Sequence, residues 1–130
     1  MGSKRSDQRE KIMQTLYQID IYKDAGLDSE IDSLIEESIK DENDFFKDLL
    51  LGTYNNLDKI DKEANTYLKD WDIKRLDKAG AAILRMSLYE FETDTPKKVI
   101  INEALNLAKK YSSTEVKNMI NACLDKRMKS

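Results

Sequence analysis

Apolar side chains recur at intervals of three and four residues along most of this chain, and only one proline, Pro96, interrupts the pattern. Such spacing gathers the apolar residues on one face of an α-helix, whereas a half-buried strand needs strict alternation. Alternating β-branched runs are nearly missing from the 130 residues. The pattern therefore predicts an all-α protein, folded as a single compact bundle of about seven helices.

The breaks in this periodicity give the expected helices. Asp24-Ala25-Gly26 ends the first helix, and Ser29 with Asp32 resembles a capping box that opens the second. Gly52 lies inside the third helix and indicates close packing against a neighbour. The helices are expected at about residues 7–23, 29–39, 44–69, 77–91, 96–111 and from 114 onward, with a short helical turn at 72–75.

The segment 77–91 is apolar around most of its circumference, so we expect it to be the central and most buried helix. It carries one internal charge, Arg85. A charge on such a helix needs a partner, either a carboxylate such as Glu90 or loop carbonyls.

Composition removes several classes of function. The chain has no histidine and one cysteine, Cys123, so it lacks the commonest general base and the ligands of a zinc site. Its four glycines are scattered, so no phosphate-binding loop is expected. No apolar run approaches the roughly 20 residues that span a bilayer. We expect a cytoplasmic protein that is not an enzyme, holds no cofactor or metal, and does not enter a membrane.

The net charge of −3 conceals an uneven distribution. Residues 24–65 carry thirteen acidic and four basic side chains, a net charge of −9, whereas residues 1–23 carry +2 and residues 66–130 carry +4. If the first and last helices lie together, their basic side chains form a patch that could neutralise phosphates; the alternative is that they are ordinary solvated helix faces. The side chains in question are Lys4, Arg5, Arg9, Lys11, Lys117, Lys126, Arg127 and Lys129.

Six short segments, in this order and covering almost the whole chain, resemble the NusB family of bacterial transcription antitermination factors. They are QTLYQ (14–18), FKDLLLG (46–52), YLKDW (67–71), RL (75–76), AILRMSLYE (82–90) and INEA (101–104). The resemblance implies one NusB-like helical RNA-binding domain over residues 1–130. NusB-like proteins bind the single-stranded boxA element of nascent ribosomal RNA leaders together with the ribosomal protein NusE. They do so within an RNA polymerase complex that contains other Nus factors and resists premature termination.

The resemblance also implies RNA-binding positions. The basic residues at the start of the chain match the family's arginine-rich motif and would contact phosphates. Tyr17 would stack on an unpaired base, or simply pack in its helix. Asn121 would read a base edge, or tie down backbone inside the bundle. The full expected set is Lys4, Arg5, Arg9, Tyr17, Lys117, Asn118, Met119 and Asn121.

A second family surface, which faces NusE, falls on Lys74, Asp77, Lys78, Gly80 and Ala81. Three positions depart from the family pattern. Gly80 stands where relatives commonly carry a charged side chain, Met119 replaces an aromatic residue, and Ala122 replaces a glycine. Asn102 and Glu103 look functional, but the usual role of such groups is to satisfy helix ends and loops.

Two other functions stay open at the level of sequence. One is a ribosomal RNA maturation factor that uses the same RNA contacts without polymerase. The other is a protein-binding helical module, or a homodimer, that has lost RNA affinity, as the changes at Met119 and Ala122 would allow.

Overall fold

The computed structural model describes residues 4–130, and over that range it contains seven α-helices, two short 3₁₀ helices and no strand. The elements are α1 (Lys4–Asp24), η1 (Asp28–Glu30), α2 (Ile31–Ile39), α3 (Asp44–Asn55), α4 (Leu57–Tyr67), η2 (Ile73–Arg75), α5 (Lys78–Glu90), α6 (Lys97–Tyr111) and α7 (Thr114–Lys129). The all-α class and the expected number of helices are confirmed. None of the helices in this range is long and apolar enough to cross a membrane.

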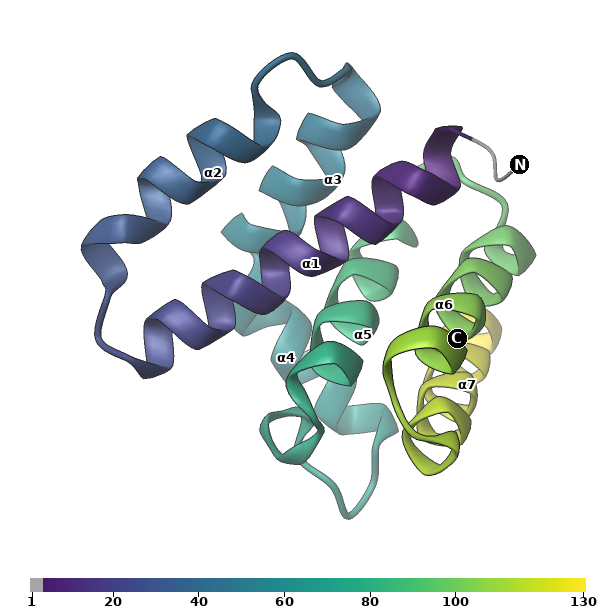
Figure 1. The fold of residues 1–130 in the computed structure, drawn as a ribbon. Coiled ribbons are helices and arrows are strands. Elements are labelled where there is room, and N and C mark those ends of the chain that lie inside the picture. Colours follow the sequence, from purple (N-terminus) through teal and green to yellow (C-terminus); the bar gives the residue numbers. More distant parts are fainter. Residues whose placement is uncertain (1–3) are drawn as a thin grey trace.

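Helix α5 is the centre of the fold. It packs against α1, α3, α4, α6 and α7 (Figure 1). Almost every side chain along it is buried, as its continuous apolar circumference predicted. Its neighbours contribute one apolar face each, among them Ile12 and Leu16 of α1 and Leu50 of α3.

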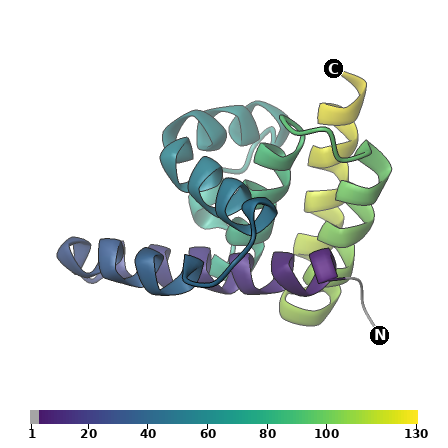
Figure 2. The same cartoon turned by 90° about the horizontal axis from the view of Figure 1, so that it is seen from above.

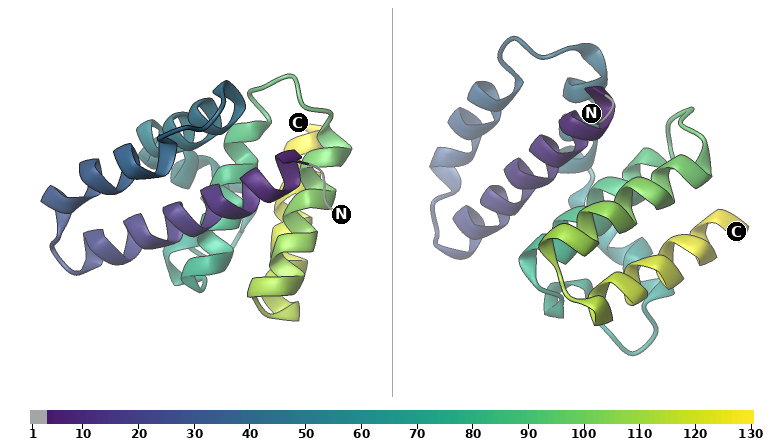
Figure 3. Two further views of the ribbon diagram at one scale, coloured as in Figure 1. Left: turned by 45° about the horizontal axis from the view of Figure 1, so that its top comes forward. Right: turned by 45° about the vertical axis from the view of Figure 1, so that its right-hand side comes forward.

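The other helices lie on two sides of α5. Helices α1 and α2 form a projecting hairpin on one side, and α6 and α7 form an antiparallel pair on the other (Figure 3). Helix α7 runs away from α1, so that the C-terminal end of the chain lies far from α1 (Figure 2). The two basic ends of the sequence are therefore not brought together along their whole length.

The long helix expected at 44–69 is two helices, α3 and α4, separated at Asn56. The Asn56 backbone leaves the helical region, with φ −123° and ψ 22°, and its side-chain amide donates to the Gly52 carbonyl at 2.7 Å. Asparagine competes for backbone groups in this way, which favours helix ends. Apolar periodicity continues on both sides because α3 and α4 each bury one face, and so it did not reveal the break.

Helix ends differ in part from the expectation. The capping box at Ser29 and Asp32 is wrong, because Ser29 lies in η1 and no side chain caps α2. Pro96 precedes the first residue of α6 instead of occupying it, and α1 already includes Ser6. Other short polar side chains do cap helices by accepting backbone N–H bonds: Asn43 for α3, Asp77 for α5 and Ser113 for α7.

Close packing at Gly52 is confirmed. A Cβ atom added there would lie 2.1 Å from Cζ of Tyr89, so the tyrosine ring of α5 occupies the space that a side chain would need. The same holds at Gly80, where an added Cβ would lie 2.6 Å from Cγ1 of Val116 on α7.

Arg85 is held by carboxylates, but not by Glu90. Its Nε donates to Asp61 at 2.7 Å, and its Nη1 lies 3.4 Å from Asp20. Positions five apart on a helix point about 140° away from each other, so Arg85 and Glu90 face different neighbours. Glu90 instead binds Arg9.

Candidate functional site

Two of the expected phosphate-binding residues lie on the surface at the start of α1. Lys4 and Arg5 are both exposed in its first turn. The Arg5 guanidinium rests on the ring of Phe45 from α3, with its carbon 4.4 Å from the ring centroid. Such a contact orients the side chain while leaving its charge at the surface.

Arg9, the third residue of the expected motif, lies inside the protein. It is 2% exposed, and its Nε and Nη2 donate to Glu90 at 2.9 and 2.6 Å. Its Nη1 also lies 3.6 Å from Glu103. The expectation that Arg9 contacts phosphates does not fit this placement, because its charge is covered and already neutralised. A basic motif read from sequence does not reveal which of its members turns inward.

Tyr17 has the accessibility that base stacking needs. It is 38% exposed and lines a surface groove formed by α1, the start of α5 and the end of α6. The groove also contains Tyr111, whose hydroxyl accepts a hydrogen bond from Gln14 at 3.0 Å and donates one to Glu10. Hydrogen bonds from Lys110 and then Tyr111 hold the pKa of Glu10 below its usual value.

A second groove adjoins the first, and Tyr111 and Asp77 line both. Met119 lies in this second groove, while Asn118 and Asn121 are exposed on the same helix, α7, and Lys117 is half-buried. Of the expected residues, the two grooves bring Tyr17 of α1 and Met119 of α7 to one continuous surface.

Trp71 lines the second groove, although the sequence indicated no binding role for it beyond its place in a segment that resembles the NusB family. It is 40% exposed and carries the Arg75 guanidinium 5.4 Å from its ring centroid. The sequence does contain a sign of this exposed position: Trp71 lies in a polar segment without apolar periodicity, and Arg75 follows it four residues later.

The basic residues at the end of α7 do not join this surface. Arg127 binds Glu63 at 3.0 Å and Glu92 at 3.1 Å. Lys126 donates to the Tyr67 carbonyl at 3.0 Å. These contacts turn the end of α7 toward α4, so the extended patch that would join both ends of the chain is not formed.

Most of the residues expected to face a protein partner share one cleft. Lys74, Asp77, Lys78 and Ala81 line it, between α1, α4, η2 and α5. Leu16, Ile19 and Leu57 supply apolar lining, and several aspartates surround them. The cleft therefore combines an apolar lining with charged groups, as a protein-binding surface commonly does.

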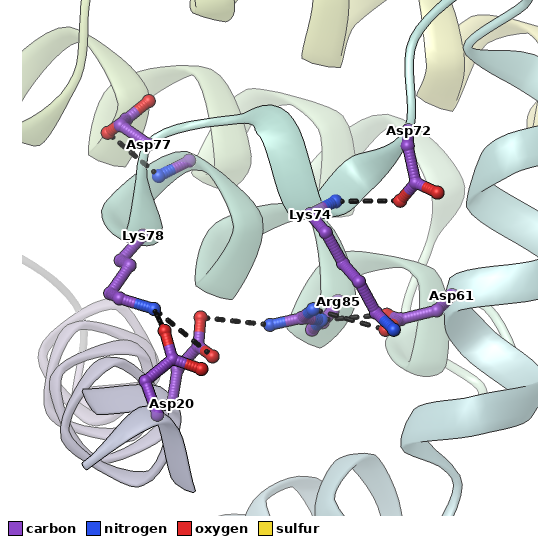
Figure 4. A network of polar contacts seen from close by, with 9 residues as sticks. Asp20, Asp61, Asp72, Lys74, Asp77, Lys78 and Arg85 are labelled. Atoms are coloured by element: carbon purple, nitrogen blue, oxygen red, sulfur yellow. Dashed lines mark hydrogen bonds and ion pairs between the residues drawn. The ribbon is translucent and has the colours of Figure 1, made fainter. Parts of the chain in front are cut away.

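Ion pairs fix the charged groups of this cleft (Figure 4). Lys78 Nζ lies 2.5 Å from Asp24 and 3.4 Å from Asp20, and Asp20 also faces Arg85. The hydrogen bond to Asp24 raises the pKa of Lys78, and the same bond lowers the pKa of Asp24. Four of the charges across the cleft are thus linked to one another.

Gly80 does not belong to the cleft. It is buried and faces Val116 of α7, so the expected place for it on a partner-facing surface is wrong. Any side chain there would displace Val116. Ala81 lines the cleft but is only 2% exposed, so it contributes shape and not an accessible group.

The remaining polar candidates are settled by their contacts. Glu103 accepts from Ser6 Oγ at 2.5 Å and faces Arg9, which is the structural role expected for it, whereas Asn102 is exposed. Across residues 4–130, no group of acidic, histidine or cysteine side chains could hold a metal ion.

Comparison with known proteins identifies the family. The NusB family profile matches residues 6–129. The chain is 37% identical to the transcription antitermination protein NusB of Acetivibrio thermocellus, over 99% of this chain and 90% of that protein. It is 38% identical to the protein of the same name from Clostridium perfringens, over 97% of both.

A solved structure supports the same family assignment. The structure of T. maritima NusB superposes with a TM-score of 0.79 at 27% sequence identity, covering 100% of this chain and 94% of that one. Family profile, relatives and fold all cover nearly the full length of the chain. The chain therefore belongs to the NusB family.

Proposed function

We propose that this protein is a non-enzymatic transcription antitermination factor of the cytoplasm. It binds boxA-like single-stranded RNA in nascent ribosomal RNA transcripts, together with the ribosomal protein NusE, and so joins the other Nus factors on RNA polymerase. The observation that carries the proposal is the pair of adjoining grooves that share Tyr111 and Asp77 and link Tyr17 of α1 to Met119 of α7.

Single-stranded RNA fits such a surface because unpaired bases stack on aromatic rings while cations follow the backbone. Each stacked base contributes roughly 1–3 kcal/mol. Tyr111 and Trp71 join the expected set as stacking rings, and Arg9 leaves it. The proposed RNA-binding residues are Lys4, Arg5, Tyr17, Trp71, Tyr111, Lys117, Asn118, Met119 and Asn121.

The cleft around Lys74, Asp77 and Lys78 is the proposed NusE surface. Asp77 lines both this cleft and the two grooves, so RNA and NusE would be neighbours on the protein. Two modest interfaces in one assembly raise each other's apparent affinity through effective concentration.

RNA binding can be measured without a label, because Trp71 is the only tryptophan of the chain and lies in the second groove. We would titrate the protein with a boxA-like oligomer and with a scrambled oligomer, with and without NusE, at several salt concentrations. Selective quenching of Trp71 fluorescence, tightened by NusE and weakened by salt, is expected.

Matched variants locate the surface. Lys117→Ala should weaken RNA binding, whereas Lys59→Ala, an exposed lysine on α4 away from both grooves, should not. Equal binding of boxA-like and scrambled RNA, even with NusE bound, would contradict the proposal. It would favour a protein-binding helical module or homodimer instead.

A further inference from the structure

We infer that Arg9 is a positioning residue of the proposed RNA site: it anchors the start of α1 to α5 and α6 and so presents Lys4 and Arg5, without itself contacting RNA. The inference rests on the proposed function for its role in binding. Its structural half, the anchoring of α1, can be tested without RNA.

The ion pair between Arg9 and Glu90 has the geometry of a fixed contact. Nε of Arg9 donates to both Glu90 oxygens, at 2.9 and 3.2 Å, and Nη2 donates to one of them at 2.6 Å. The two side chains are 3% and 1% exposed. A planar guanidinium bound side-on to a carboxylate is both strong and directional.

A second carboxylate extends the anchor to the preceding turn of α1. Glu103 of α6 accepts from Ser6 Oγ at 2.5 Å and lies 3.6 Å from Nη1 of Arg9. Ser6 and Arg9 are three residues apart and so share one face of α1. This face is held by two neighbouring helices at once.

Phe45 of α3 connects this buried anchor to the surface. Its ring contacts the guanidinium of Arg9, 5.1 Å from the centroid, and that of Arg5, at 4.4 Å. Arg5 and Arg9 are one turn apart, so fixing Arg9 also fixes the turn that carries Lys4 and Arg5. Lys4 and Arg5 therefore meet RNA from an ordered helix instead of a frayed end.

Direct contact between Arg9 and a phosphate is disfavoured by the same geometry. Arg9 would have to give up its three hydrogen bonds and leave the Glu90 carboxylate buried without its main partner. Removing one member of a buried ion pair is far more costly than losing an exposed contact.

The test measures how RNA affinity depends on salt in the full-length protein. For single strands, each phosphate contact adds about 0.7 to the slope of log K against log salt concentration. Lys4→Ala is the positive control and should reduce the slope by about that amount. Arg9→Met should weaken binding about tenfold, because the first turn must be ordered on binding, yet it should leave the slope unchanged.

A double variant guards against misfolding. Arg9→Met combined with Glu90→Met replaces the ion pair by two apolar side chains, a change that buried pairs often tolerate. If Arg9 only positions α1, the double variant should bind RNA more tightly than Arg9→Met alone, with the wild-type slope. A double variant that loses about 0.7 of slope, as Lys4→Ala does, would overturn the inference.

Glu90→Gln should change RNA affinity in opposite directions for the two possible roles of Arg9. It weakens RNA binding if Arg9 acts through Glu90, whereas it tightens binding if Glu90 merely competes with phosphate for Arg9.

Amide hydrogen exchange tests the anchor in the absence of RNA. Arg9→Met should speed exchange in the first three turns of α1 and leave the exchange rates in α4 unchanged. If the wild-type protein binds no RNA, the proposed function fails, while slow exchange in Arg9→Met would refute the anchor.

Discussion

Tyr111 at the end of α6 donates its hydroxyl hydrogen bond to the carboxylate of Glu10 on α1. Lys110 binds the same carboxylate, with Nζ 2.6 Å from Oε2. One acidic side chain thus fixes the ring that lines both grooves. Glu10 therefore links the stability of the α1–α6 contact to the shape of the proposed RNA surface.

This contact should make part of the stability depend on pH. The folded protein holds the pKa of Glu10 below the ordinary value of 4.5, through Lys110 first and Tyr111 second. A carboxyl group whose pKa is lower in the folded than in the unfolded chain stabilises the fold at any pH above its pKa in the unfolded chain. This stabilisation is lost as the pH falls through the pKa of the folded protein. Urea unfolding of wild type and Glu10→Gln should differ at pH 7, and the difference should shrink below pH 4.5. A constant difference would contradict this account.

Gly52→Ala should destabilise the protein although alanine favours helices. The added Cβ would overlap the Tyr89 ring, and such overpacking typically costs about 1–3 kcal/mol, more than the helix propensity gained. The free energy of unfolding in urea measures the change. The double variant Gly52→Ala with Tyr89→Leu, which lacks the ring, should lose less stability than the two single variants lose together. If the two losses are strictly additive, overlap with the Tyr89 ring is not what destabilises Gly52→Ala.

Asp61→Asn should cost more than a comparable change at the surface. Asp61 binds Arg85 through two hydrogen bonds, at 2.7 and 3.1 Å, and both side chains are largely covered. Since Asp20 stays near Arg85, we expect a loss of about 1–3 kcal/mol in thermal or urea unfolding. Asp125→Asn is the matched control, because Asp125 pairs with Lys129 at an exposed position, and its cost should be within about 0.5 kcal/mol.

Much of the fold could be predicted because helical periodicity is a local property. The buried circumference of α5 and the close approach at Gly52 were both visible as patterns of residue size and polarity. The break at Asn56 was not, since it depends on one side-chain amide bonding the Gly52 carbonyl while the apolar pattern continues.

The site was predictable only in part, because exposure depends on tertiary packing. The sequence left Tyr17 open between base stacking and helix packing, and only the fold shows that its side chain is accessible. The residues expected to face a partner gather in one cleft, apart from Gly80. The sequence does not distinguish Arg9 from Arg5, since both are arginines of one basic motif. In the fold, Arg9 faces Glu90, whereas Arg5 is exposed to solvent. What separates them is the acidic residue on α5, eighty-one positions away in the sequence.

Cys123 should report global unfolding. It is buried in α7, and burial first, with the Glu63 charge second, raises the pKa of its thiol to about 12. Because the thiolate is the reactive form, a thiol reagent at pH 8 should leave the folded protein unmodified and react fully in denaturant. The labelling rate in water should then rise in step with destabilisation by Gly52→Ala, since both follow the population of unfolded chains. Rapid labelling of the wild type, without a matching loss of stability, would mean that the end of α7 opens on its own.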